Sequence, residues 1–471
     1  MTTTSLVALL VVIVVFLGLL AIRLHVALSL MIAGLVGVLM LRTTGAAIST
    51  AANQPFSTAA DYSLTIIPLF IVMGVFAVNG RLATAGFDIA SRVLRRFPGG
   101  PALASLSGSG LFAAVTGSSV ATVATMARVS TDAIVKAGHS IKLAAGVVSA
   151  GGTLGVLIPP SIVLVLYGVV TEESIGQLLL AGVGPGLLTV LMYAATIVLL
   201  VVAQRRKQRA ATPALVGAEV GGSGSSSSSS GSGGGTTTAE AEPADAGPGK
   251  VKLDLMGGLF LAVIFAVSIG TIYLGVATPT EAASFGAMAA LIILLIRTRP
   301  PQWLKAVGDS VTEAVGLTAM TFLLMAGAGV FTYFLALSGT STALVNAVIS
   351  AELAPYLVLV LCLLLLLPLG MFLDGISMIL VAAPLLHPIL TGYGFDGIWL
   401  GILIVKVAEM ALITPPVGMN AFVYSGAVPE AGLGRVFRGI VPFIVADLVV
   451  VAVLILVPEI TTFLPDLSAA S

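Results

Sequence analysis

The chain has 471 residues, of which 58% are hydrophobic and only 9% are charged. A soluble domain carries about 25% charged residues, so this composition excludes a water-soluble protein and indicates one that crosses a lipid bilayer several times. The formal net charge is zero, which argues against a nucleic-acid partner.

The first half of the chain contains apolar runs of the length that a membrane-spanning helix needs, about 20 residues. A Gly-, Ser- and Ala-rich segment interrupts the series, and Pro159-Pro160 divides a later apolar segment. The predicted parts of this half, residues 1–209, are scaffold spans within 5–97 (5–22, 26–41 and 63–79), a hairpin at 100–135, a broken helix at 143–170 and a span at 178–203.

Residues 210–250 differ in composition, since residues 221–235 are almost pure Gly and Ser. Such a segment is expected to be a flexible linker. The apolar pattern returns after it. The predicted parts of the second half, residues 251–471, are scaffold spans within 253–337 (253–275, 281–297 and 309–337), a hairpin at 354–392, a broken helix at 398–427 and a span at 438–458.

One apolar segment in each half is interrupted by a double proline, Pro159-Pro160 in the first and Pro415-Pro416 in the second. Proline removes a backbone donor and breaks a helix, and in lipid the freed backbone groups need partners. One broken helix in each half is therefore typical of the binding site of a secondary transporter. A polar glycine turn precedes each break at nearly the same spacing, at Gly117 and at Gly375.

Lys and Arg residues collect in short segments, which are expected to lie in cytoplasmic loops. These segments are 81–96, 136–142, 205–209, 297–305 and 435–438. This assignment makes the linker cytoplasmic and both termini external, and the two hairpins then enter the membrane from opposite sides. We therefore predict an all-α polytopic membrane protein, an inverted repeat with two re-entrant hairpins and two discontinuous helices.

The first hairpin has a polar turn at its centre, formed by Gly117, Ser118 and Ser119, and Thr122 follows it. A hard cation such as Na⁺ needs hydroxyl and carbonyl oxygens that converge without bulk, and helix C-terminal ends supply more of them. Helix N-termini would instead attract an anionic substrate. The alternative interpretation, close packing of small residues between helices, stays open for these residues.

The second hairpin carries a carboxylate inside an apolar stretch, because Asp374 precedes Gly375 and Ser377. An ionisable residue within a membrane segment is expensive and suggests function, although Asp374 could also cap the returning helix. Lys406 and Glu409 share one face of the helix that leads to the second break. They are either a neutralised pair or, for Glu409, a direct participant in ion or substrate binding.

No sign of ATP or zinc chemistry accompanies these features. Gly249-Lys250 lacks the remainder of the Walker A pattern, and His25, His139 and His387 are widely separated. We therefore expect neither an ATP site nor a zinc site.

Several longer runs resemble the large membrane (permease) subunit of tripartite ATP-independent periplasmic (TRAP) transporters. These runs are GSSVAT at 117–122, AGGTLGVLIPPS at 150–161, YGVVTEESIG at 167–176, GVATPTEAA at 275–283, GMFLDGISM at 370–378 and LITPPVGMN at 412–420. The resemblance extends over nearly the whole chain apart from the linker.

The resemblance implies an elevator-type secondary transporter of the bacterial inner membrane. It would use a Na⁺ gradient, without ATP, to import an organic acid such as a C4-dicarboxylate, sialic acid or a similar sugar or keto acid. A periplasmic binding protein would deliver this substrate, and a small four-helix membrane subunit would complete the complex.

The resemblance also implies two Na⁺ sites, with the substrate between the hairpin tips. One site would use Gly117, Ser118 and Ser119 with Gly152, Thr153 and Pro159, and the other Asp374, Gly375 and Ser377 with Thr414, Pro415 and Gly418. Substrate contacts are expected from Ser118, Ser119, Thr122, Asp374, Ser377 and Asn420, and coupling from Glu409 and Lys406. The chain departs from the family pattern in its longer linker and in the charged Lys406.

Three other interpretations stay open. The chain could be a stand-alone Na⁺- or H⁺-coupled carrier of the dicarboxylate or citrate type, which works without a binding protein. A membrane-embedded enzyme would need a cluster of acid, base or metal-binding residues that the sequence does not offer. A purely structural membrane scaffold would leave the two matched helix breaks without a use.

Overall fold

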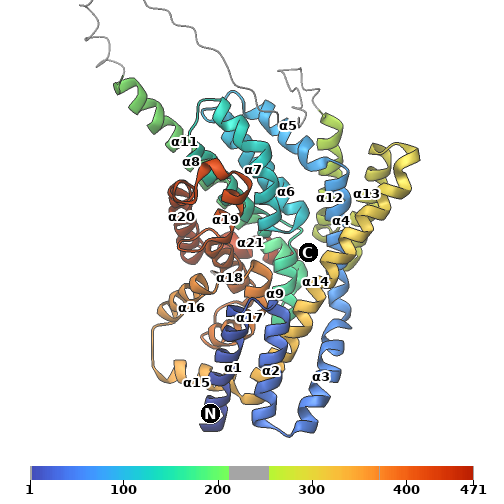
Figure 1. The fold of residues 1–471 in the computed structure, drawn as a ribbon, viewed down its shortest axis with the longest axis vertical. Coiled ribbons are helices and arrows are strands. Elements are labelled where there is room, and N and C mark those ends of the chain that lie inside the picture. The colour runs from blue at the N-terminus through green and yellow to red at the C-terminus, as the bar shows by residue number, and fades with distance from the viewer. Residues whose placement is uncertain (1–2, 212–253, 371, 470–471) are drawn as a thin grey trace, which may run out of the picture.

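The computed structural model describes residues 3–211, 254–370 and 372–469. Over these ranges the chain forms helices joined by turns and contains no strand (Figure 1). The prediction of an all-α membrane fold is therefore confirmed. The predicted linker at 210–250 lies outside the described residues except for residues 210–211, which end a helix.

The first half begins with helices that pack against one another and ends with the hairpin and the broken helix. Its elements are α1 (Thr3–Ala21), α2 (Val26–Leu41), α3 (Thr44–Ala59), η1 (Tyr62–Thr65), α4 (Ile66–Asn79), α5 (Leu82–Leu94), α6 (Gly100–Thr116), α7 (Ser119–Lys136), α8 (Ile141–Gly151), η2 (Gly152–Val156), α9 (Ile162–Thr171), α10 (Ile175–Ala181) and α11 (Val183–Ala211).

The second half follows a comparable order. Its elements are α12 (Leu255–Tyr273), α13 (Pro279–Arg297), η4 (Pro300–Gln302), α14 (Trp303–Ser338), α15 (Thr340–Ser350), α16 (Pro355–Leu369), α17 (Gly375–Gly392), α18 (Gly397–Ala411), α19 (Met419–Ala427), η5 (Pro429–Ala431), α20 (Leu433–Leu456) and α21 (Glu459–Ala469).

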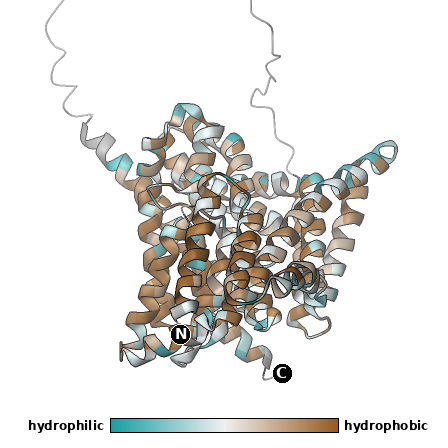
Figure 2. Cartoon of the chain, turned by 60° about the horizontal axis from the view of Figure 1, so that its bottom comes forward, coloured by the Kyte–Doolittle hydropathy of each residue, from teal (hydrophilic) through white to brown (hydrophobic). Residues whose placement is uncertain are grey.

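Eight helical runs among the described residues are long and apolar enough to cross a membrane. Figure 2 shows their hydrophobic residues as a band across the middle of the molecule, with hydrophilic residues mainly at its upper and lower edges. Large apolar side chains of the outer helices are exposed, such as Val14 on α1 and Leu259 on α12. In lipid such exposure is favourable, so these surfaces are the bilayer-facing sides of the protein.

Besides α5, three helices lie where we predicted none. They are α3, α15 and α21, each of 11 to 16 residues. Their sequences are rich in Ser, Thr and Ala and lack a long apolar run, so a search for membrane-spanning segments does not find them. Packing against neighbours supplies the missing stability: α3 lies along α14, α15 contacts α17, and α21 contacts α10.

The helices form two groups with many contacts inside each. In the first, which we call the scaffold group (α1–α4 and α12–α14), the long α14 packs along α2, α3 and α4, and α4 packs along α13. In the second, which we call the hairpin group (α6–α11 and α16–α21), the two halves of the chain interleave: α8 packs on α20, α7 on α19 and α9 on α17. Helix α5, of 13 residues, joins the groups through contacts with α6 and α12 (Figure 1).

The double prolines interrupt their helices at the predicted positions. In the first half, α8 tightens into η2 and ends before Pro159, and α9 restarts with Ser161, whose Oγ accepts a hydrogen bond of 3.2 Å from the Leu164 N–H. In the second, α18 ends at Ala411 and α19 restarts after Gly418. The Pro159-Pro160 and Pro415-Pro416 peptide bonds are both cis.

An ion pair joins the end of α13 to the start of α12, the two helices that begin the second half. Arg297, the last residue of α13, donates a hydrogen bond to the carboxylate of Asp254, which directly precedes α12. This hydrogen bond holds the pKa of Asp254 below its usual range. Asp254 also accepts a hydrogen bond of 2.8 Å from the Gly257 N–H and so caps α12.

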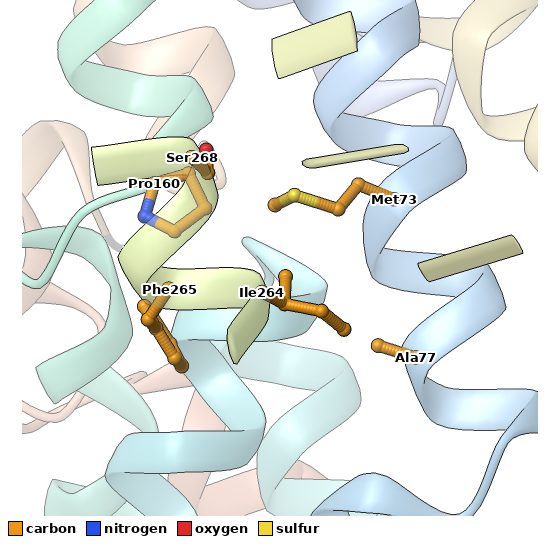
Figure 3. A pocket seen from close by; sticks show the side chains of 6 residues that line it. All are labelled: Met73, Ala77, Pro160, Ile264, Phe265 and Ser268. Carbon is orange, nitrogen blue, oxygen red and sulfur yellow. The ribbon is translucent and has the colours of Figure 1, made fainter. Parts of the chain in front are cut away.

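The first helix break faces the scaffold group across a small apolar gap. Pro160 lies opposite Met73 of α4 across a cavity of about 10 Å³, and Ser268 of α12 also lines this cavity (Figure 3). The Ser268 hydroxyl is buried and makes no hydrogen bond among the described residues. At this point the two groups therefore meet through non-directional contacts.

Candidate functional site

Hairpin one (α6 and α7) turns at residues whose polar groups are satisfied within the turn itself. Ser118 caps α7, because its Oγ accepts a hydrogen bond of 3.3 Å from the Ala121 N–H. The Thr122 hydroxyl donates to the Ser118 carbonyl at 2.8 Å and lies 3.3 Å from the Thr116 hydroxyl. Thr122 is fully buried, so it shapes the tip from inside.

Two glycines allow this tip to lie directly on the first helix break. Gly117 has a φ of +63°, which favours glycine, and a Cβ there would lie 2.8 Å from Cδ1 of Ile162 at the start of α9. A Cβ at Gly152 would lie 2.9 Å from the carbonyl oxygen of Ser119. Any larger residue at either position would separate the hairpin from the break.

Hairpin two (α16 and α17) packs closely against the end of α18, and a glycine again permits the close approach. A Cβ at Gly370 would lie 2.3 Å from the Ala411 Cβ. Asp374 stands at the N-cap position of α17, but its side chain caps no backbone N–H and instead accepts a hydrogen bond from the Ser377 hydroxyl. The Asp374 carboxylate is thus held at the tip by a side chain of its own hairpin.

Glu409 touches both hairpin tips. Its Oε2 accepts a hydrogen bond from the Ser119 hydroxyl of hairpin one. Its Oε1 faces hairpin two, since a Cβ at Gly375 would lie 2.6 Å from it. With 2% of its surface exposed, this carboxylate is enclosed by protein.

A second buried carboxylate forms a network with Lys406. The Lys406 Nζ donates to Asp447 Oδ1 of α20 at 2.5 Å, and both side chains are at most 2% exposed. The Tyr193 hydroxyl of α11 donates to Asp447 Oδ2 at 2.7 Å and lies 3.4 Å from the Thr153 hydroxyl of η2. Lys406 is thus paired with Asp447, whereas Glu409 forms no ion pair within 4 Å among the described residues.

Besides Ser109 Oγ, which lies 3.0 Å from the position of a Cβ at Gly151, two buried oxygen atoms near the first break make no hydrogen bond among the described residues. They are Asn420 Oδ1 and Ser149 Oγ, on residues that are fully buried. The Asn420 amide donates to the Ser149 carbonyl at 3.3 Å and faces Gly152. Buried polar oxygens normally have partners, so this donor set fits a hard cation, which takes oxygen ligands.

The second break places its predicted residues differently. The Thr414 hydroxyl donates to the Met410 carbonyl within its own segment at 2.7 Å, and Pro415 is exposed. Gly418 has a φ of +56° and lies against Phe437 of α20. The glycines near the tip of hairpin two, Gly370 and Gly375, instead face Ala411, Glu409 and Leu412, about one turn earlier than the second double proline.

A cavity of about 360 Å³ lies where both hairpin tips meet α4 and α14 of the scaffold group. Among the predicted residues, Gly117, Ser118 and Asp374 line it, whereas Ser119, Thr122, Ser377 and Asn420 are buried behind it. Its other polar lining comes from Thr116, Thr125, Thr321 and Glu313, and no Lys, Arg or His belongs to the lining.

A second cavity, of about 330 Å³, follows further along α14. It is lined mainly by residues of α3, α9 and α14, such as Gln54, and also by Asp61 before η1 and Glu172 after α9. The two cavities share no lining residue, and on α14 they abut where Leu324 of the first is followed by Met325 of the second.

Sequence reasoning missed three residues of this region: Asp447, Tyr193 and Glu313. Asp447 stands alone in the apolar run of α20, which is itself a signal for function or pairing. Tyr193 and Glu313 carry no such signal, because only the packing of α11 and α14 decides what they face.

Two helical hairpins that meet over a cavity, supported by two broken helices and a separate scaffold, define a membrane transporter of the discontinuous-helix type. The structure is similar to the YdaH transporter of Alcanivorax borkumensis, with a TM-score of 0.56 and 15% identity over 88% of each chain. At this identity the likeness shows the fold alone.

The sequence comparisons are more specific. Residues 13–460 match the model of the tripartite ATP-independent periplasmic transporter DctM component, so the chain belongs to this family. It is 34% identical to the C4-dicarboxylate TRAP transporter large permease protein of Pseudomonas aeruginosa, over 87% of this chain and 88% of that one. It is 31% identical to the corresponding protein of Vibrio cholerae, over 96% of each. The predicted family is confirmed, and the chain is a multi-pass transporter subunit rather than an enzyme.

Proposed function

We propose that this chain is the permease subunit of a Na⁺-coupled importer of an organic acid anion in a bacterial inner membrane. The observation that carries the proposal is the charge of the cavity between the hairpin tips. Asp374 and Glu313 line it and Glu409 lies behind it, and among the described residues no basic side chain belongs to the lining. An anion can enter such a space only together with cations, so cation and substrate binding must be coupled.

The cation sites follow from the same region. Hairpin one and the first break offer Ser118, Gly117 and Gly152 with the free oxygens of Asn420 and Ser149. Hairpin two and the end of α18 offer Asp374, Gly375 and the carboxylate of Glu409. Thr153, Pro159, Thr414, Pro415 and Gly418 would support these sites from the helix breaks. Bound Na⁺ would supply the positive charge that offsets the substrate.

The substrate class follows from two relatives that are both named as C4-dicarboxylate permeases. We therefore propose a C4-dicarboxylate first, and a sugar or keto acid next. A periplasmic binding protein would deliver it, and a small four-helix membrane subunit would complete the complex. The hairpin group would carry the substrate past the scaffold group, as in an elevator, with both termini external and the linker cytoplasmic.

The test is uptake into proteoliposomes that contain this chain with its small subunit. Labelled organic acids are supplied with the cognate binding protein, with and without an inward Na⁺ gradient. We expect uptake that needs both. Uptake without the binding protein would favour a stand-alone carrier, and uptake that follows a proton gradient but ignores Na⁺ would contradict Na⁺ coupling.

The site is tested with Asp374→Asn, which removes a charge from the cavity while Asn can still accept the hydrogen bond from Ser377. The neutral amide is a poorer ligand for a cation than a carboxylate, so uptake should fall, and a loss of about 1.4 kcal/mol in cation binding corresponds to a tenfold decrease. The matched control is Asp396→Asn, at the N-cap of α18 and outside the cavity lining. Asn caps as well as Asp, so the control should retain uptake.

A further inference from the structure

The hairpin group contains a large cavity that the transport site does not use. It has a volume of about 330 Å³ and lies between α15 and the two helices of hairpin two. Its walls are formed by aliphatic side chains and Cys362, among them Val348 of α15, Leu365 of α16 and Leu386 of α17. We call this space the hairpin-two cavity.

The chemistry of the walls excludes a polar occupant. A water molecule in a cavity needs two to four polar partners, and the walls offer only Cys362, a weak donor. Protein interiors are packed at the density of organic crystals, so a void of this size would forfeit many dispersion contacts. The occupant must therefore be apolar.

The mouth of the cavity is continuous with the bilayer-facing surface. Leu361 and Leu365 belong to the cavity wall, and they are 50% and 55% exposed on the outer side of α16. Leu357 and Leu364, on the same helix, are 48% and 51% exposed. In a membrane the medium at this face is lipid hydrocarbon, which can enter the cavity without crossing any polar group.

We propose that the hairpin-two cavity is a binding site for one acyl chain of a membrane lipid. The site is built into the moving hairpin: Leu369, the last residue of α16, lines the cavity, and the tip with Asp374 follows a few residues later. An acyl chain in the cavity joins α16 to α15 and α17, so lipid binding is linked to the position of the hairpin-two tip. This proposal does not depend on the identity of the transported solute or ion.

The site can be tested by photolabelling the full chain, together with its small subunit, in liposomes. The probe is a phosphatidylethanolamine with a diazirine near the end of one acyl chain, and labelled residues are mapped by peptide mass spectrometry. We expect labels on the buried wall, at Val381, Ala382 or Leu386, which are 3% to 7% exposed. Labels confined to outward residues such as Leu364 would overturn the proposal. So would wall labels that vanish when the small subunit is present, since that subunit would then fill the space.

A pair of variants separates the cavity from the general lipid surface. Ala382→Leu fills the cavity and should abolish the wall labels while leaving those on the outer face of α16. Leu364→Ala, which changes the outer face of α16 but not the cavity lining, should leave the wall labels unchanged. Wall labels that persist in Ala382→Leu would contradict the assignment.

A measurement on the unaltered chain covers the case in which Ala382→Leu does not fold. Cys362 is the only cysteine in the sequence and lines the cavity. Its modification by N-ethylmaleimide should be slower in protein purified with bound lipid than after delipidation, and should slow again when phospholipid is restored. Equal rates under all three conditions would overturn the proposal.

Discussion

At the scale of single residues, the compensation of buried charge decides how the site is built. Lys406, Asp447 and Glu409 are all at most 2% exposed, so each needs a partner inside the protein. Lys406 and Asp447 are partners of each other, since the Lys406 Nζ donates a hydrogen bond of 2.5 Å to the Asp447 carboxylate. Glu409 has only the Ser119 hydroxyl as a hydrogen-bond donor among the described residues. A buried carboxyl group between the tips of the two hairpins, without a basic partner in an ion pair, is a position at which a bound cation would be effective.

The Lys406 and Asp447 pair can be tested by a double-mutant cycle. Removing one partner of a buried ion pair costs about 3–5 kcal/mol, because the other charge stays buried without compensation. Lys406→Met and Asp447→Asn should therefore each lower the thermal unfolding temperature of the purified protein strongly. The double variant, which buries no charge at this place, should recover most of the loss. Additive losses would show that the two residues act independently.

At the scale of elements, close contacts between backbones hold the two halves of the chain together. Helix α8 of the first half crosses α20 of the second at Gly146 and Gly439. A Cβ at Gly439 would lie 2.0 Å from the Lys142 carbonyl oxygen, and one at Gly146 would lie 2.1 Å from the Gly439 carbonyl oxygen. Small residues permit such crossings in membranes, where the hydrophobic effect does not drive helices together.

The crossing predicts opposite results for two glycine substitutions. Gly439→Ala should destabilise the protein by about 1–3 kcal/mol, because backbone atoms must move to admit the methyl group. Gly316→Ala on α14 is the control, since no atom lies within 4 Å of a Cβ there. Ala is the better helix former, so the control should be neutral or slightly stabilising. Thermal unfolding of both variants in the same detergent is the measurement, and equal effects would contradict the close crossing.

At the scale of the whole molecule, the two polar cavities occupy successive stretches of α14. The first is lined by residues from Glu313 to Leu324 and the second by residues from Met325 to Ala336. The start of α14 follows the basic segment that contains Arg297 and Arg299 and itself contains Lys305, which favours the cytoplasmic side for this end. The first cavity would then open to the cytoplasm and the second to the exterior.

This arrangement predicts labelling from opposite sides of the membrane. In a Cys362→Ala background, Thr125→Cys in the first cavity should react with a membrane-impermeant maleimide from the cytoplasmic face. Thr58→Cys in the second cavity should react from the periplasmic face. The comparison uses inside-out and right-side-out vesicles. Reaction of both positions from one face would contradict the assignment of the cavities and of the termini.

The sequence by itself determined the class of the protein, its apolar spans and the positions of its two helix breaks. Apolar length and proline act within a few residues of the chain, so their effects can be found without knowing any tertiary contact. The motifs around Gly117, Pro159, Asp374 and Pro415 also identified the family, which the comparisons confirmed. The inverted repeat, the Na⁺ sites and the location of the termini stay predictions.

The tertiary structure alone decided which of these residues meet. Lys406 pairs with Asp447 of α20, and Glu409 contacts both hairpins. The spacing of these residues in the sequence predicts neither contact. The helices α3, α15 and α21 escaped prediction because packing, rather than their own composition, stabilises them in place. The cavity lining likewise depends on α4 and α14, which carry no motif. Long-range contacts of this kind arise from the packing of whole helices, which local sequence patterns do not encode.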